Sequence, residues 1–286
     1  MLNFDDTIKQ LRVKREEYAT REIKGKRLKI PFVNEETDVI VYGTENPLKS
    51  SPVFFNLHGG AWIGGDAVLM ESFCLMLAKE INGMVVNINY KKLDERPFPY
   101  QQEEVKNTVL YFASKAEEYG VDKNKFILSG CSAGGHIAAG SALLLSKTDF
   151  RLAAQVLIYP FLAFDAEAKE ETHNFLNEAV GLFCPNINLK DEIISPLLAE
   201  KESLSKLPKT SVITCGKDIL LSHGKEYAEK LNELGVDVDY RFYPEALHGF
   251  LEVNRVEAEG DERASAEQLE MTKDCEKYIA EFIKRI

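Results

Sequence analysis

A serine flanked by glycines is the residue best suited to covalent chemistry in this sequence. Gly130-Cys131-Ser132-Ala133-Gly134 has the form G-x-S-x-G, follows a strand-like run and opens a helical one. A serine at such a turn takes a strained backbone, and its hydroxyl projects from the carboxyl edge of the sheet beside the helix N-terminus. Ser132 is therefore predicted to be a nucleophile. The alternative is a Gly/Ser turn that caps a helix.

A serine hydroxyl also needs a base within hydrogen-bond reach, because it is a poor nucleophile alone. His248 fits this role, since it follows the last predicted strand and Gly249 permits a tight loop at the same sheet edge. The alternative is a loop histidine without a catalytic role. His136, His173 and His223 are interpreted as packed or solvated polar side chains of helical segments.

The base in turn needs a buried acceptor that fixes its tautomer and stabilises its cation. Asp218 comes just beyond the strand-like run Ser211–Cys215, again at the carboxyl edge. Its alternative reading is an Asx-turn or a helix N-cap. Ser132, Asp218 and His248 follow strand ends in the chain order that this sheet topology requires. We therefore expect these three side chains to form a catalytic triad.

A glycine pair supplies the remaining requirement, donors for a developing oxyanion. His58-Gly59-Gly60-Ala61-Trp62 directly follows the run Val53–Leu57. Consecutive glycines let backbone N–H groups turn toward a reacting carbonyl, and one such donor is worth about 3 kcal/mol to the transition state. Ala133, just after the nucleophile, offers a further N–H. The alternative is a tight β-turn without a role in anion binding.

Two alternating patterns must position these residues. Short, almost wholly apolar runs indicate strands buried on both faces: Val53–Leu57, Met84–Tyr90, Phe126–Ser129, Gln155–Tyr159 and Ser211–Cys215. Longer segments with helical periodicity separate them: Val68–Ile81, Glu103–Tyr119, Gly134–Leu145 and Gly224–Leu234. Further strands are expected at Leu28–Phe32, Val39–Tyr42 and Val238–Tyr243, and a closing helix from about Ala264. This alternation predicts an α/β fold with a mostly parallel sheet and helices on both faces.

One interval breaks the alternation. About fifty residues separate Tyr159 from Ser211, and within them Phe175, Leu176, Ala179, Val180 and Phe183 form an apolar helical stripe. An insertion of this size in an α/β unit is usually a lid or cap, and the alternative is an ordinary packing helix. The first twenty residues are also predicted to be helical, from the three- and four-residue spacing of their apolar positions.

Composition excludes several classes of protein. The 286 residues are 45% hydrophobic and 28% charged, which argues against a disordered chain. The net charge of −11 disfavours nucleic acid and anionic lipid as partners. No apolar run approaches the length of a membrane helix, and no export signal is expected at the start. Five cysteines without a C-x-x-C pair favour a reducing compartment, so we expect a cytoplasmic protein.

The four motifs together resemble the hormone-sensitive-lipase-like branch of the α/β-hydrolases, the bacterial carboxylesterases and acetylesterases. They are HGGAW (58–62), GCSAGG (130–135), CGKD (215–218) and HGF (248–250), and the likeness spans roughly residues 52 to 250. Three departures stand out. Ala61 replaces a third glycine, Cys131 replaces the Glu or Asp common before the nucleophile, and the residues after Asp218 differ from the usual pattern.

The resemblance implies an α/β-hydrolase fold, in which a mostly parallel eight-stranded sheet is flanked by helices and carries a small helical cap. It implies one domain over residues 1–286, with cap elements at approximately 1–25 and 161–205. It also implies a triad of Ser132, Asp218 and His248. The implied oxyanion hole is formed by the main chain of four residues: Gly59, Gly60, Ala61 and Ala133.

The expected activity is hydrolysis of small carboxylic esters, with acetyl to butyryl acyl groups, through an acyl-enzyme. An amidase or formamidase with the same triad is the alternative, and a non-catalytic relative that binds a small molecule is a further one. No metal or nucleotide motif is present, so no cofactor is expected. Beyond the small-molecule ester we expect no nucleic-acid or membrane partner, and homodimer formation stays open.

Overall fold

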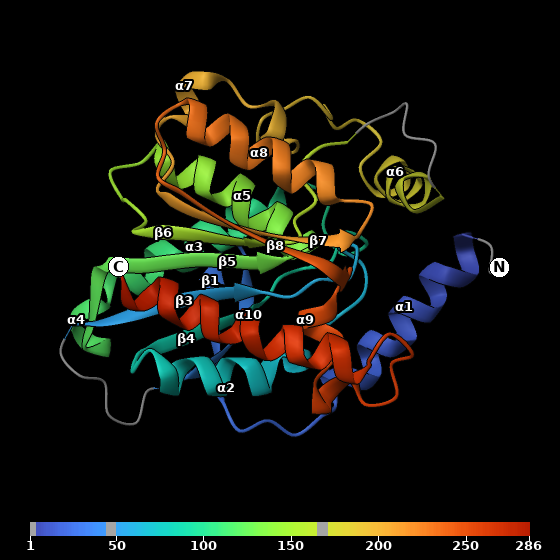
Figure 1. Ribbon diagram of the computed structural model, residues 1–286, viewed down its shortest axis with the longest axis horizontal. Coiled ribbons are helices and arrows are strands. Elements are labelled where there is room, and N and C mark those ends of the chain that lie inside the picture. The colour runs from blue at the N-terminus through green and yellow to red at the C-terminus, as the bar shows by residue number, and fades with distance from the viewer. Residues whose placement is uncertain (1–3, 44–49, 165–170) are drawn as a thin grey trace.

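Eight strands form a single sheet in the computed structural model, which describes residues 4–43, 50–164 and 171–286, with side chains of the last range described from residue 175 (Figure 1). Their order across the sheet is β1-β2-β4-β3-β5-β6-β7-β8. In chain order they are β1 Lys26–Phe32, β2 Glu35–Tyr42, β3 Ser51–Leu57, β4 Met84–Asn89, β5 Val121–Cys131, β6 Ala154–Ile158, β7 Lys209–Lys217 and β8 Val238–Leu247.

The sheet is mostly parallel, as predicted. β2 is antiparallel to both of its neighbours, β1 and β4, and every other adjacent pair is parallel. β5 begins at Val121, five residues before the predicted start at Phe126, because the polar residues 122–125 interrupt its apolar pattern and its continuous buried run starts at Phe126. An apolar criterion therefore finds the core of a strand and misses its exposed end.

Helices cover both faces of the sheet (Figure 1). On one face lie α3 (Tyr100–Ser114), α5 (Ala133–Ser146) and α8 (Leu221–Glu233), and on the other lie α2 (Glu71–Glu80) and α10 (Ala266–Lys284). Each face has its own hydrophobic core. Successive residues of β3 show the alternation, since Phe55 belongs to the first core and Phe54 to the second, and both are fully buried.

Two further helices lie beyond the carboxyl ends of the parallel strands, at the right of Figure 1. They are α1 (Phe4–Ala19) and α6 (Glu171–Phe183), and they touch through the rings of Phe4 and Phe175, whose centroids are 5.4 Å apart. Of the expected cap segments, residues 1–3 and 165–170 lie outside the described part of the chain. The two predicted helices, one in the first twenty residues and one around the apolar stripe at residues 175–183, are thus present at the edge of the sheet where the candidate residues lie.

Short helices complete the description: α4 Ala116–Tyr119, α7 Lys201–Leu204 and α9 Phe250–Val253, with 3₁₀ turns at Ala67–Met70, Pro196–Leu198 and Val256–Ala258. The helix predicted over Glu103–Tyr119 is in fact two, α3 and α4. They are separated at Lys115, whose φ of −111° and ψ of 17° are not helical. Hydrophobic periodicity continues across this break and so does not reveal it.

Candidate active site

The candidate nucleophile lies at a sharp turn between β5 and α5. Ser132 has φ 53° and ψ −115°, a conformation that costs a non-glycine residue about 1–3 kcal/mol. The flanking glycines make the turn possible. A Cβ on Gly130 would lie 2.2 Å from the carbonyl oxygen of Gly134, and a Cβ on Gly134 would lie 2.4 Å from that of Leu57. The predicted turn from strand to helix is therefore present, with its glycines in places that exclude larger residues.

The structure brings the three predicted side chains together. His248 Nε2 lies 2.8 Å from Ser132 Oγ, and His248 Nδ1 lies 2.7 Å from Asp218 Oδ2. A carboxylate can only accept, so the ring nitrogen facing Asp218 carries the proton and the other nitrogen is free to accept from the serine hydroxyl. The Asp218 side chain is 1% exposed, and that of His248 is 35% exposed. A substrate can thus reach the base, whereas its carboxylate partner is shielded from water.

Asp218 also fulfils its alternative reading. Its second oxygen, Oδ1, accepts the backbone N–H of Leu220 at 2.9 Å, which is an Asx-turn at the start of the segment leading to α8. One oxygen thus orients the carboxylate within its own loop and the other contacts His248. The Asx-turn therefore orients the Asp218 carboxylate and leaves its other oxygen available for His248.

The glycine loop after β3 has an unusual backbone. Gly60, Ala61 and Trp62 all have positive φ, of 121°, 50° and 63°. Gly60, Ala61 and Ala133 line the same cavity as Ser132. Gly59 differs from the prediction, because its N–H already donates to Glu252 Oε1 at 2.7 Å. Gly59 is thus removed from the predicted set of oxyanion donors.

Comparison with known proteins identifies the family of the chain. A family model described as the alpha/beta hydrolase fold matches residues 54–252. The chain belongs to the α/β-hydrolase fold family. Its resemblance to the hormone-sensitive-lipase-like branch is confirmed by the same match.

Individual relatives of this α/β hydrolase extend the comparison. The chain is 29% identical over 222 residues to an arylesterase of Saccharolobus solfataricus, covering 73% of this chain and 71% of that protein. It is also 31% identical over 214 residues to a protein of Acanthamoeba polyphaga mimivirus that is named as an α/β hydrolase. That alignment covers 71% of this chain but only 62% of the mimivirus protein. A solved structure of a hyperthermophilic esterase from Pyrobaculum calidifontis matches with a TM-score of 0.82 at 24% identity, covering 99% and 91% of the two chains.

A buried histidine, His136, contacts the glycine loop of this α/β hydrolase through Trp62. Trp62 Nε1–H donates to His136 Nδ1 at 3.0 Å, so the other ring nitrogen of His136 carries the proton and donates to the carbonyl oxygen of Ile194 at 2.8 Å. Burial lowers the pKa of His136 to about 4, which keeps the ring neutral. His136 is a packed residue, as predicted, and it fixes the only tryptophan of the chain.

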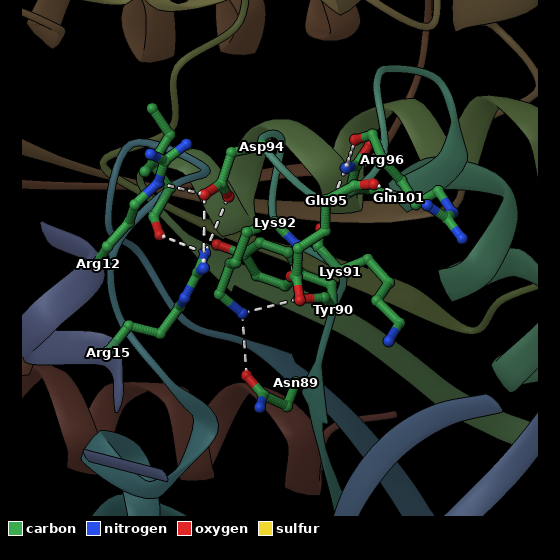
Figure 2. A network of polar contacts seen from close by, with 11 residues as sticks. Arg12, Arg15, Asn89, Tyr90, Lys91, Lys92, Asp94, Glu95, Arg96 and Gln101 are labelled. Atoms are coloured by element: carbon green, nitrogen blue, oxygen red, sulfur yellow. Dashed lines mark hydrogen bonds and ion pairs between the residues drawn. The ribbon is translucent and has the colours of Figure 1, made fainter. Parts of the chain in front are cut away.

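A buried lysine lies beside Tyr90, whose ring packs on His58 just before the same loop (Figure 2). Lys92 Nζ donates to Tyr90 O at 2.7 Å and to Asn89 Oδ1 at 3.0 Å, and burial lowers its pKa to about 8. The Tyr90 ring stacks on His58 at 4.5 Å, and its hydroxyl donates to the His58 carbonyl oxygen at 3.0 Å. Burial also lowers the pKa of His58, with Lys92 acting in the same direction. These contacts hold His58, which directly precedes Gly59, against Tyr90.

An ion-pair cluster, which Figure 2 shows from close by, attaches helix α1 to Asp94 and to the end of the glycine loop. Asp94 accepts from Arg15 Nη1 at 2.9 Å and from Arg12 Nε at 2.7 Å, and Arg15 Nη1 also donates to the Ile63 carbonyl oxygen at 3.1 Å. Burial acts to raise the Asp94 pKa, but the hydrogen bonds from Arg15 and Arg12 outweigh it, so the pKa is lowered. The carboxylate therefore stays charged and holds α1 in place.

The cavity beside Ser132 has a volume of about 610 Å³, within the range of small-molecule sites. Its floor contains Ser132, His248 and the glycine loop. The two helices beyond the sheet edge supply one wall: Thr7, Leu11, Lys14 and Tyr18 from α1, and Phe175 and Leu176 from α6. Both helices therefore border the space in front of Ser132.

Among the described residues, no group of three or more His, Cys, Asp or Glu side chains is placed to hold a metal ion. Within the same residues, no helix has both the length and the apolar character needed to cross a membrane.

Proposed function

We propose that this protein hydrolyses carboxylic esters through an acyl-enzyme formed on Ser132. The observation that carries the proposal is the hydrogen-bonded chain from Ser132 Oγ through His248 to Asp218, with distances of 2.8 and 2.7 Å. A serine joined in this way to a base, and the base to a buried carboxylate, is an activated nucleophile. The names of the related proteins, arylesterase and esterase, support the same reaction class.

In the first half of the reaction, Ser132 Oγ attacks the ester carbonyl carbon while His248 Nε2 takes the hydroxyl proton. The carbonyl oxygen becomes an oxyanion, and the N–H groups of Gly60, Ala61 and Ala133 are the donors we assign to it. Each such donor contributes about 3 kcal/mol. His248 then gives its proton to the leaving alkoxide, and the acyl group stays on the serine.

In the second half, water replaces the serine as nucleophile. His248 takes a proton from the water, the hydroxide adds to the acyl carbon, and the Ser132 oxygen leaves as it regains its proton. Asp218 holds the ring so that Nε2 faces the reacting oxygen in both halves, and it stabilises the imidazolium.

We further propose that α1 and α6 belong to a cap on a single hydrolase domain, with the cap segments at about 1–25 and 161–205. The support is that both helices line the cavity and contact each other through Phe4 and Phe175. Acetyl to butyryl esters are the proposed substrates, on the basis of the family resemblance. A cytoplasmic location is proposed because all five cysteines are free and buried.

The experiment that tests the proposal combines turnover with active-site labelling. Purified protein is assayed with p-nitrophenyl acetate, butyrate, octanoate and a matched aryl formamide, and is then treated with a p-nitrophenyl alkylphosphonate and mapped by mass spectrometry. We expect ester turnover, fastest for the short chains, and a phosphonate adduct on Ser132 that is absent in Ser132→Ala. Faster cleavage of the formamide would assign an amidase instead. Absence of both turnover and adduct would overturn the proposal.

A further inference from the structure

Glu252 connects the glycine loop with Tyr159, whose ring packs on the candidate base His248. It lies on α9, four residues after His248, and lines the cavity. Its Oε1 accepts the N–H of Gly59 at 2.7 Å, and its Oε2 accepts the hydroxyl of Tyr159 at 3.2 Å. One carboxylate thus connects the second residue after β3 with the residue directly after β6, and neither contact is part of the reaction described above.

The contact with Gly59 depends on the missing side chain. A Cβ on Gly59 would lie 2.7 and 2.9 Å from the two carboxylate oxygens of Glu252. Gly59 directly precedes Gly60 and Ala61, whose φ values of 121° and 50° are unfavourable for most residues. A hydrogen bond of 2.7 Å from the Gly59 N–H to a carboxylate oxygen at the start of this segment restrains the amides that follow it.

The contact with Tyr159 leads to the base. The rings of Tyr159 and His248 pack edge to face, with centroids 5.1 Å apart at 62°. Burial raises the pKa of Glu252, while the Gly59 N–H and the charge of His248 act in the opposite direction. The Glu252 carboxylate is therefore linked to the ring of His248 through Tyr159, and the charge of His248 favours the ionised form of Glu252.

We propose that Glu252 is a positioning residue that holds the oxyanion loop through Gly59 and stabilises the charged form of His248. This inference rests on the proposed function, because both groups matter only if Ser132 reacts through a tetrahedral oxyanion. Glu252 does not touch the reacting atoms in this role. It acts by holding the backbone N–H donors and the imidazole of His248 in place relative to Ser132 Oγ.

Two substitutions separate geometry from charge. Glu252→Gln keeps an oxygen that accepts the Gly59 N–H but removes the charge, whereas Glu252→Ala removes both. We expect Glu252→Ala to lower kcat for p-nitrophenyl acetate about 30-fold, with KM within threefold of wild type. This loss of kcat is smaller than the loss of about 10²–10³-fold that is typical when an oxyanion donor is deleted. Glu252→Gln should recover most of that loss, because the loop contact is restored.

The pH profile isolates the charge. With the carboxylate gone, the pKa seen in kcat/KM should move to lower pH in both variants, since a negative neighbour favours the imidazolium. The other charged or titratable groups that contact His248 or line the same cavity are unchanged in the comparison: Asp218, Tyr159, Lys14, Tyr18, Lys217, Asp261 and Arg263. A residue that merely stabilises the fold would not shift this pKa.

Glu257→Ala is the matched control. Glu257 comes from the same segment and accepts both the N–H and the hydroxyl of Ser72 at 2.8 Å, but it does not line the cavity. We expect it to lower the melting temperature without changing kcat. The inference is overturned if Glu252→Ala keeps kcat within twofold of wild type, or if Glu257→Ala loses as much.

The phosphonate reaction distinguishes failure of this inference from failure of the proposed function. If wild type neither turns over esters nor forms the Ser132 adduct, the proposed function fails. If wild type reacts and Glu252→Ala reacts equally fast, only the role of Glu252 fails. If Glu252→Ala does not fold, Glu252→Gln is still decisive, because unchanged kcat and an unchanged pH profile would refute the role in charge stabilisation.

Discussion

Asp218 and His248 are hydrogen bonded at 2.7 Å because the residues before them, Lys217 and Leu247, are paired across β7 and β8. The register between these strands shifts just before that pair, after Cys215 opposite Tyr243. β8 therefore contributes more residues than β7 to the last part of the ladder. Such an irregularity bends a strand and re-aims its side chains. Here it sets two consecutive strand ends side by side, so that the acid and the base meet above Ser132.

Asp218→Asn tests this pairing. The amide keeps Oδ1 for the Leu220 N–H and nearly the same shape, but it can hold His248 in the wrong tautomer. We expect kcat for p-nitrophenyl acetate to fall by about 10⁴-fold with an unchanged melting temperature. Stopped-flow and steady-state rates at neutral pH measure the loss. A variant with full activity would show that another acid serves His248.

Ser132 allows a paired test of chemistry and strain. Ser132→Ala and Ser132→Gly should both lose turnover by several orders of magnitude, because neither has a hydroxyl. Their stabilities should differ, since glycine adopts the φ of 53° at no steric cost. After the entropy lost by glycine, we expect Ser132→Gly to be more stable than Ser132→Ala by about 1 kcal/mol. Urea denaturation of the two variants side by side gives the difference, and equal midpoints would contradict the strain.

The grouping of Ser132, Asp218 and His248 could be predicted because each follows a predicted strand, a short apolar run before Ser132 and Asp218 and the more polar run Val238–Tyr243 before His248. In a parallel sheet such runs are buried strands, and their carboxyl ends share one edge. The same logic found the glycine loop after β3. It could not find the polar start of β5 or the break at Lys115, because neither changes the apolar pattern on which the prediction rests.

Glu252 shows what the sequence could not reveal. It is one of 46 acidic residues, and nothing in its neighbours distinguishes it from a solvated position. Its importance comes from contact with Gly59, 193 residues earlier in the chain, and that contact also removes Gly59 from the predicted oxyanion donors. Lys92 was missed for the same reason, since its burial follows from the packing of Tyr90 and α1 around it.

A buried carboxylate on α3 predicts a pH dependence of stability. Burial raises the pKa of Glu104 to about 7, although its Oε2 accepts the Lys91 N–H at 2.9 Å. The folded state thus binds this proton more tightly than the unfolded state. Its contribution is most favourable below pH 4.5 and is lost progressively as the pH rises to about 7.

Glu104→Gln should remove that loss. The stability of this variant relative to wild type should rise between pH 4.5 and 8, by on the order of 3 kcal/mol. Urea denaturation at several pH values measures it, and Glu103→Gln, at a half-buried position of the same helix, is the control. If both variants follow the wild-type pH dependence, Glu104 is not the source.

The cluster at Asp94 predicts that α1 controls substrate binding rather than chemistry. Asp94→Ala removes the acceptor of both Arg12 and Arg15 and leaves Arg15 partly buried without its carboxylate, which should cost about 1–3 kcal/mol of stability. Because α1 lines the cavity with Leu11 and Tyr18, its loosening should raise KM for p-nitrophenyl butyrate several-fold while kcat stays within about twofold. Glu36→Ala removes one carboxylate of an exposed ion pair with Lys29 and should change neither constant. A fall in kcat at unchanged KM would instead place Asp94 in support of the glycine loop, through the contact of Arg15 with the carbonyl oxygen of Ile63.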